Sequence, residues 1–329
     1  RLLPSAPSTS SGQASAFCLL PFSVNHNGAQ TMSPKQVWRM LKSAFQAWNQ
    51  DKASRLAAAS AYYTIFSIAP LLILVIAIAG FFFDTATVRD QLMGQIESLV
   101  GGNGAEFLRT ALDNANRPGQ NSGWIATIVS IVLLLVGSTG VLVQLQTALN
   151  DIWEVEADPE RGLGNVVRKR LLSFGMILAI GFLLLVSLVI SSVIAGFSSY
   201  FSTIAPGLDA LIQLLNFVVG FGITTLLFAL IFKYVPDVVI TWGDVWFGAI
   251  VTALLFSIGK FAIGLYLGNS GFASSYGAAG SVIVLLVWIF YSAQILFFGA
   301  ELTQVFAQRF GSQIRPNKYA VAQEPVPHE

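Results

Sequence analysis

A lysine stands in the middle of an otherwise apolar stretch, LLFSIGKFAIGLYLG (254–268). An ionisable side chain at membrane depth is costly, so Lys260 needs a partner, a water-filled cavity or a route to the surface. In a cavity it could hold the phosphate or carboxylate of an anionic compound. It could equally snorkel outward, since about 10 Å of helix remains on that side, or form a structural ion pair. The sequence leaves these three interpretations open.

Polar residues follow one face of the last apolar stretch. Gln294, Glu301 and Gln308 are seven residues apart, and Gln304 lies near the same helix face. A stripe of this kind indicates hydrogen bonds between neighbouring helices in a membrane. Because Glu301 ends the apolar run, we expect it near the membrane surface, about 20 Å from Lys260 along straight helices. We therefore do not expect these two side chains to pair.

Two further candidate positions lie inside apolar stretches. Pro70 removes one backbone hydrogen bond from its helix and bends it, which serves either packing or a hinge. Gln144 gives another apolar stretch a polar face, and the glycines of GSTG (137–140) in that stretch permit the close approach of a second helix.

The inventory of reactive residues excludes several kinds of site. The chain has one cysteine, Cys18, and two histidines, His26 and His328, near its ends. It has no P-loop, no dinucleotide-binding glycine pattern, no HExxH and no GxSxG. We therefore expect no enzyme, no cofactor and no metal centre. One acidic run is interpreted as a solvated loop or a weak divalent-cation site: Asp151, Glu154, Glu156, Asp158 and Glu160.

The composition is that of a membrane protein. Hydrophobic residues make up 54% of the chain and charged residues 11%, where ordinary soluble chains have about 25% charged residues. A bilayer core of about 30 Å needs about 20 apolar residues in a helix. We predict an all-α fold, a polytopic membrane protein with a bundle of six transmembrane helices. The six spans lie at about 57–83, 124–146, 171–195, 211–234, 245–268 and 278–301.

The distribution of basic residues predicts the orientation, because cytoplasmic loops carry an excess of lysine and arginine. Residues 32–56, the segment between spans two and three, Lys233 at the end of span four and the segment after the sixth span together carry thirteen of them. The opposite loops carry three, namely Arg89, Arg109 and Arg117. We therefore expect both termini in the cytoplasm. The net charge of +1 gives no electrostatic basis for binding nucleic acid.

The segments outside the spans have their own signals. Residues 1–31 are rich in Ser, Pro, Gly and Ala and are interpreted as a disordered or spurious N-terminal extension, since Met32 is typical of a natural start. Residues 32–56 predict a cytoplasmic amphipathic helix, either on the membrane surface or packed on the ends of the bundle. Within the transmembrane domain, 57–308, residues 84–123 predict a helical outer cap. Residues 309–329 are expected to be a disordered cytoplasmic tail.

Three segments carry a family resemblance. They are LAAASAYYTIFSIAPLLILVIAIAG (56–80), GSTGVLVQLQTALNDIWEV (137–155) and SSYGAAGSVIVLLVWIFYSAQILFFGAELTQVFA (274–307). Together they resemble the YihY/virulence factor BrkB family, with a likeness that runs from about Lys35 to Arg309. The resemblance implies a multi-pass bacterial inner-membrane protein with six spans and no settled activity. An older family label, ribonuclease BN, has no support in a chain without a metal-binding cluster or a basic surface.

The resemblance also adds positions to the candidate list. Lys260 fits the family pattern, and the other positions that belong to the family-like segments are Asn150, Ile152, Trp153, Tyr276, Gly277, Gly299, Ala300 and Glu301. What these residues bind does not follow from the resemblance.

Two functions fit these observations. The first is a passive or ion-coupled transporter, flippase-like, for an anionic or amphipathic envelope component, with membrane lipids around it and a lipid or small solute as its substrate. The second is a non-transporting envelope scaffold that organises other proteins. A charge change at Lys260 separates them, because only a transporter should lose activity while it still folds. The sequence does not decide whether the chain forms a homo-oligomer.

Overall fold

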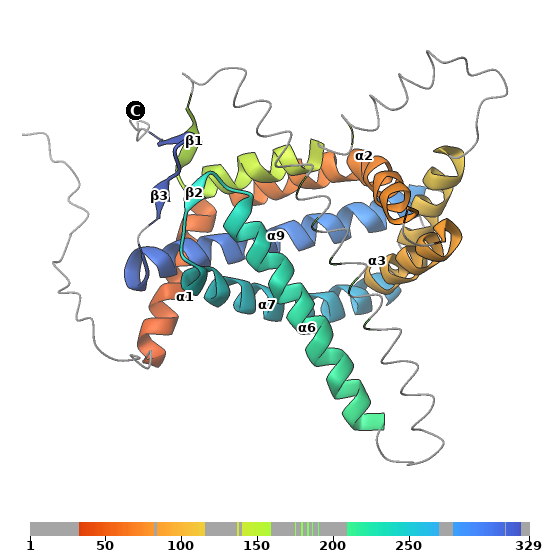
Figure 1. The fold of residues 1–329 in the computed structure, drawn as a ribbon. Helices are drawn as coiled ribbons and strands as arrows, with labels where there is room; N and C mark the ends of the chain where they lie inside the picture. The colour runs from red at the N-terminus through yellow and green to blue at the C-terminus, as the bar shows by residue number, and fades with distance from the viewer. Residues whose placement is uncertain are drawn as a thin grey trace, which may run out of the picture.

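The structure is a bundle of long helices with short strands at one end (Figure 1). This computed structural model describes residues 33–81, 84–115, 140–158, 209–269, 279–312 and 314–323, with isolated positions at 137, 175, 179, 183, 186 and 190. The described helices are α1 (Pro34–Gln50), α2 (Ala53–Ala79), α3 (Thr85–Ala115), α6 (Asp209–Tyr234), α7 (Trp242–Asn269) and α9 (Gly280–Phe310), together with helical residues 140–152. The strands are β1 (Val155–Ala157), β2 (Val238–Val239), β3 (Arg315–Pro316) and β4 (Ala320–Ala322).

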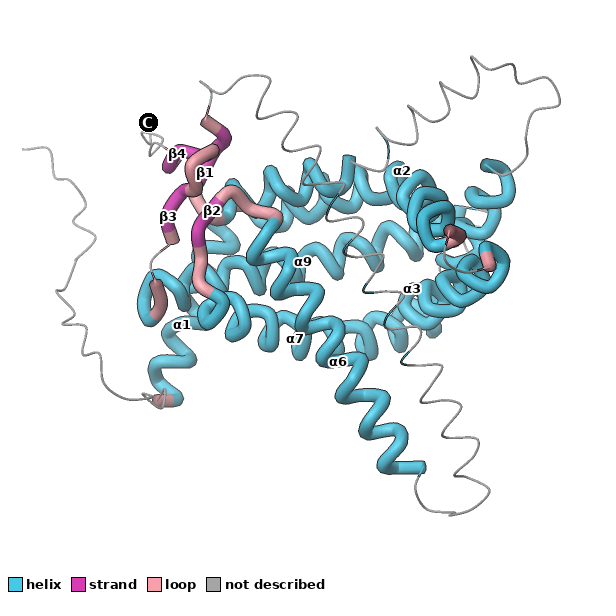
Figure 2. Tube along the Cα trace, viewed as in Figure 1, coloured by secondary structure: helices cyan, strands magenta, loops and turns pink. Residues whose placement is uncertain are grey.

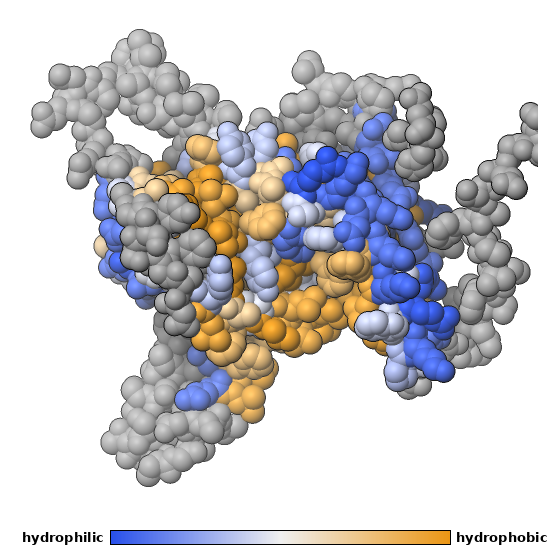
Figure 3. All heavy atoms as spheres, turned by 180° about the vertical axis from the view of Figure 1, so that it is seen from behind, coloured by the Kyte–Doolittle hydropathy of each residue, from blue (hydrophilic) through white to orange (hydrophobic). Residues whose placement is uncertain are grey.

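Four of the predicted spans are present as helices long and apolar enough to cross a membrane. They cover Ala53–Ala77, Gln213–Tyr234, Trp242–Tyr266 and Gly280–Phe310. The predicted span over 171–195, apart from isolated helical positions, and most of the span over 124–146 lie outside the described residues. Figure 3 shows apolar residues gathered in the middle of one face, with hydrophilic residues to either side, as a bilayer-spanning body requires.

The closest helix contact joins α7 and α9, which run antiparallel. A Cβ on Gly248 of α7 would lie 1.7 Å from Thr303 Oγ1, and a Cβ on Gly299 of α9 would lie 2.0 Å from Thr252 Oγ1. Each glycine therefore receives the threonine of the other helix. Both hydroxyls donate back to their own helices, Thr252 to Gly248 O and Thr303 to Gly299 O, each at 2.7 Å. The two threonine hydroxyls therefore keep hydrogen-bond partners although they lie between the helices.

A second close contact joins α2 to the helix over 140–152 and position 137. A Cβ on Gly137 would lie 3.1 Å from Pro70 Cγ, and a Cβ on Gly140 would lie 3.0 Å from Ser67 Oγ. The close approach that GSTG predicts is confirmed at these two glycines. Pro70 stands inside α2, and its ring forms part of this helix–helix contact.

The two ends of the bundle differ. At one end, which we call the cap end, α3 is broken at Gly101, whose φ of 78° suits glycine. Asp84 caps the start of α3 by accepting from Thr87 N at 2.9 Å, and this bond lowers the pKa of Asp84. The two halves of α3 bury Leu92 and Leu108, in agreement with the helical segment that the sequence predicts within 84–123.

At the other end, which we call the strand end, all four strands lie together (Figure 2). Strand β1 pairs with β4, and β2 pairs with β3, both antiparallel. The prediction of a disordered tail over 309–329 is therefore wrong where β3 and β4 stand. Those short segments carry little signal of their own, and they are ordered because partner strands from distant parts of the chain supply the hydrogen bonds.

Helix α1 lies against the strand-end half of α9. Met40 and Ala44 are buried and pack with Leu302 and Val305, while Trp38 on another face is 70% exposed. Of the two arrangements open for this amphipathic helix, packing on the bundle is the one that the structure contains. The exposed Trp38 still leaves an aromatic side chain for a membrane surface.

The α7–α9 contact generates the first prediction. Gly299→Ala places a methyl group against Thr252, and overpacking of this kind costs about 1–3 kcal/mol of unfolding free energy. The matched control is Gly264→Ala on α7, because no atom lies within 4 Å of a Cβ there. The control is expected to be neutral or stabilising, since alanine favours a helix over glycine by about 1 kcal/mol. Thermal unfolding in detergent measures both; equal stability of the two variants contradicts the prediction.

Candidate functional site

Several of the predicted positions meet at the strand end, around Glu301. Trp153, which follows the helix over 140–152, donates from Nε1 to Ala300 O at 3.3 Å. Ile152 and Trp153 are buried in the same core as Ala300. The family-like segments around 150–153 and 299–301 are thus in direct contact, although well over a hundred residues separate them in the chain.

Glu301 itself is fully buried. Helix α9 does not end with the apolar run but continues to Phe310. The position of Glu301 near the membrane surface therefore stays a prediction, but its side chain is not exposed there. Leu302 and Val305, which follow Glu301 on α9, pack against Met40 and Ala44 of α1. Neither Glu301 oxygen accepts a hydrogen bond from a neutral or basic donor among the described residues.

The Glu301 carboxyl faces an acidic neighbour that sequence reasoning missed. Asp51, at the C-terminal end of α1, is half-buried and within hydrogen-bonding reach of Glu301. We refer to Asp51 and Glu301 as the acidic pair. Asp51 stands in NQDK (49–52), which reads as a solvated turn, and only the packing of α1 and α2 against α9 brings it to Glu301. The single sequence signal is an acidic residue directly before a span.

Two carboxyl groups at this end have pKa values above the ordinary 3.8. Burial raises the pKa of Asp51; its bond with Glu301 opposes this, and the negative charges of Glu154 and Asp151 raise it further. Burial also raises the pKa of Asp151, against a hydrogen bond with Gln323. The acidic run is therefore not simply a solvated face, since Asp151 is half-buried and Val155–Ala157 form β1.

The predicted position Asn150 belongs to a second polar cluster, centred on the buried Asp237. Asn150 Nδ2 and Gln146 Nε2 each donate to Asp237 Oδ2 at 3.1 Å, and Asp237 N donates to Asn150 Oδ1 at 2.8 Å. Asn317 of the C-terminal segment donates to Asp237 Oδ1 at 3.3 Å. Asp237 accepts these bonds from two other parts of the chain, which is the pattern of a structural lock between loops.

The predicted stripe on α9 faces the bundle through most of its length. Gln294 Nε2 donates to Ser54 Oγ of α2 at 2.9 Å, which is the interhelical bond that the stripe indicates. Gln304 is buried, whereas Gln308 is exposed. Gln294 Oε1 is buried and has no partner among the described residues.

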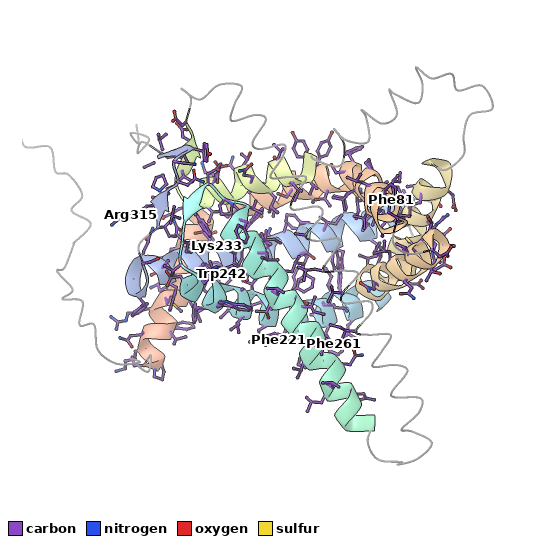
Figure 4. The ribbon with its side chains drawn as sticks, viewed as in Figure 1. Phe81, Phe221, Lys233, Trp242, Phe261 and Arg315 are labelled. Atoms are coloured by element: carbon purple, nitrogen blue, oxygen red, sulfur yellow. The ribbon has the colours of Figure 1, made fainter. Side chains whose placement is uncertain are left out.

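Lys260 lies in the other half of the bundle and does not meet Glu301. It is half-buried and makes no hydrogen bond or ion pair with the residues that the structure describes. It continues the inner face of α7, since Ala249, Ala253 and Phe256 precede it at helical spacing and pack in the core. Phe261, the next residue, is 71% exposed on the outside (Figure 4).

The Tyr291 hydroxyl of α9 meets α7 at Gly259, the residue before Lys260. A Cβ on Gly259 would lie 2.5 Å from Tyr291 Oη, so α9 presents this hydroxyl to α7 one residue before the lysine. Lys233, by comparison, is satisfied: it donates to Ile240 O and lies 5.9 Å from the centre of the Trp242 ring (Figure 4). Of the two lysines on the long helices α6 and α7, Lys260 is the one without a described partner.

The remaining candidates take smaller parts. Pro70 contributes to helix packing, as described above. Gln144 is half-buried and makes no hydrogen bond with the described residues. Tyr276 lies outside the described residues. Within the described part of the chain, no three His, Cys, Asp or Glu side chains are grouped so that they could hold a metal ion.

The raised pKa of Asp51 generates the second prediction. Because the folded state binds a proton at Asp51 more tightly than the unfolded chain does, the free energy of unfolding falls as the pH rises above about 3.8. Asp51→Asn removes this loss. We expect the variant to have the higher Tm near neutral pH, with the difference closing as the pH falls toward 3.8.

The control is Asp90→Asn, which changes an exposed aspartate on α3. Its Tm should follow that of the wild type across the same pH series. If Asp51→Asn were less stable than the wild type near neutral pH, the ionised Asp51 would be stabilising and the prediction would be wrong.

Known proteins similar to this chain are described as membrane proteins. A UPF0761 membrane protein of Pseudomonas aeruginosa is 29% identical over 255 residues, which are 77% of this chain and 59% of that protein. One of Ralstonia nicotianae is 27% identical over 261 residues, 79% of this chain and 56% of the relative. One of Alteromonas mediterranea is 28% identical over 268 residues, with shares of 79% and 85%.

The chain thus spans less than two thirds of the length of the first two relatives. No solved structure matches it. The family described as virulence factor BrkB matches residues 44–324, a range that includes Asp51, Lys260 and Glu301. With apolar helices that could span a membrane and a match over most of its length, this chain is a membrane protein that belongs to the virulence factor BrkB family.

Proposed function

We propose that this protein is a passive or ion-coupled transporter, flippase-like, for an anionic or amphipathic component of the bacterial envelope. The observation that carries the proposal is Lys260, a half-buried cation on the inner face of α7 with no described partner. A lysine that only snorkelled to lipid would stand on the outer face, with Ile258 and Phe261, which are 60% and 71% exposed. Its place on the stripe of Ala253 and Phe256 supports an internal position.

The groups around Lys260 suit an anionic ligand. An ammonium group is a strong donor without any acceptor capacity, and the Tyr291 hydroxyl is a donor from the neighbouring helix. Phosphate and carboxylate oxygens accept from both kinds of group. The surroundings are apolar: the rings of Phe256 and Trp288 meet edge to face, with their centroids 6.1 Å apart. Such surroundings suit the acyl or alkyl part of an amphipathic compound.

We also propose the inner membrane as its location, with six spans and both termini in the cytoplasm. Helix α1 and strand β4, near the two ends of the chain, lie at the same end of the bundle, which supports an even number of crossings (Figure 2). The helix over 140–152 and α6 both run toward the strand end (Figure 1). Because these two helices follow one another in the chain and run in the same direction, the chain has to cross back between them. This supports a span between them, where the sequence predicts the one over 171–195.

The third prediction tests transport. The full chain is reconstituted in vesicles, and movement of a fluorescent anionic phospholipid between leaflets is measured by quenching from outside. Lys260→Gln is expected to slow this movement by about tenfold or more, since a hydrogen bond to a charged group contributes about 1.5–3 kcal/mol. A zwitterionic phospholipid should depend less on Lys260, because it lacks the net negative charge.

The matched control is Lys42→Gln, the same chemical change at an exposed position of α1. It should move lipid at the wild-type rate. Equal rates for Lys260→Gln and Lys42→Gln would remove Lys260 from the pathway. Movement no faster than in empty vesicles for every variant would contradict lipid transport and favour a scaffold.

A further inference from the structure

The Glu301 side chain is buried in a way that leaves its carboxyl group unsatisfied. Its exposed fraction is 0%, and neither oxygen receives a hydrogen bond from a neutral or basic donor among the described residues. An ionised carboxylate without donors in such a place is far more costly than a buried neutral group. Buried polar atoms without partners in a native protein call for an explanation, such as a bound ion or water.

Asp51 is within hydrogen-bonding reach of Glu301, and it is also a carboxyl group. Two ionised carboxylates are acceptors only, so they hydrogen-bond to each other only if one of them keeps a proton. Paired carboxyl groups in one site cannot both ionise easily, because like charges repel strongly at short distance. The geometry is therefore that of two acids around one proton, with Glu301 as the donor and the half-buried Asp51 as the acceptor.

We propose that the acidic pair is a proton-binding site, in which one proton is held between the Glu301 and Asp51 carboxyl groups at the strand end of the bundle. A proton is the cation that two carboxyl groups can hold without further ligands. A divalent metal ion needs more oxygen ligands than the pair offers, and the described residues contain no group of three that could hold one.

The surroundings of the acidic pair favour keeping the proton. The other charged groups that act on it are acidic, namely Glu154 and Asp151 from the end of the neighbouring helix. Lys52, in the turn before α2, and Arg55 on α2 lie close in sequence but are exposed. On α9, Arg309 donates to Ser43 Oγ at 2.7 Å.

The other element packed against this part of α9 is α7, which carries no charged residue between Asp244 and Lys260. Asp244 accepts from Thr241 Oγ1 at 2.8 Å and from Ser312 N at 3.0 Å at the far end of α9. No basic side chain among the described residues pairs with either member of the acidic pair.

Other buried polar atoms lie on the helices around the acidic pair. Trp48 Nε1, Ser60 Oγ and Gln294 Oε1, on α1, α2 and α9 respectively, are buried and have no hydrogen-bond partner among the described residues. Gln294 shares the face of α9 that carries Glu301, two turns away, and its amide already contacts Ser54 of α2. Buried polar atoms of this kind are the positions at which ordered water satisfies hydrogen bonds in proteins.

The consequence for transport rests on the proposed function. If the protein is an ion-coupled transporter, the acidic pair identifies its coupling ion as the proton. The binding of the proton does not depend on transport, and it can be measured separately.

The fourth prediction is read by infrared difference spectroscopy on the full chain in lipid, in H₂O and D₂O, across a pH series. The C=O stretch of a protonated, buried carboxylic acid should persist near neutral pH in the wild type. Glu301→Gln should abolish this band, because it replaces the acid by an amide of similar shape. Asp51→Asn should shift its frequency or titration midpoint, because the hydrogen-bond partner changes.

The matched control is Glu106→Gln, an exposed glutamate on α3, which should leave the band unchanged. If Glu301→Gln does not fold, the proposal is tested by Asp51→Asn alone, through the shift of the band's frequency or titration midpoint. A neutral-pH spectrum without such a band, or a band unaffected by both variants, overturns the proposal. A band with the expected responses in a protein that moves no lipid would keep the proton site and reject lipid transport.

Discussion

The close contact between α7 and α9 is the constraint on which both candidate regions depend. Gly248 with Thr303, Thr252 with Gly299, and Gly259 with Tyr291 belong to one antiparallel register. Because each glycine admits a side chain that any Cβ would displace, the two helices cannot slide past each other by a turn. This register places Tyr291 against Gly259, next to Lys260 in the chain, in one half of the bundle. It also fixes the part of α9 that α1 covers at the strand end, and thereby the burial of Glu301.

The strand end is held together by buried polar groups rather than by apolar packing alone. Trp153 donates to Ala300 O, and Asp237 accepts from Asn150 and Asn317. Asp244 accepts from Ser312, which follows α9. Each of these bonds joins segments that are far apart in the chain. In a low-dielectric interior such bonds are strong when complete and costly when broken. The strand end therefore has a defined shape, which is what a buried carboxyl pair needs to stay in contact.

The sequence predicts those features of the structure that depend on local residue patterns better than those that depend on contacts between distant segments. Long apolar runs predict four of the spans, because hydropathy is a local property of each helix. The burial of Glu301 could not be predicted in the same way, because hydropathy falls at the very residue where α1 begins to cover α9. The role of Asp51 could not be predicted for a related reason. NQDK (49–52) has the composition of a solvated turn, and Glu301, the partner of Asp51, is 250 residues away in the chain. Strands β3 and β4 exist only through partners from two other loops.

The separation of the charges within the bundle has a physical consequence. Lys260 lies level with Tyr291, so about 15 Å of α9 separate it from Glu301. Had the lysine and the glutamate formed an ion pair, each would have neutralised the other, and neither would need a ligand. Kept apart in apolar surroundings, each charge needs its own compensation, for which we have proposed an anion at the ammonium group and a proton at the carboxyl group. Both sites border α9, so a shift of this one helix would reach both. A protein of this design could therefore couple a proton at one end to an anion in the other half without any contact between the two ligands.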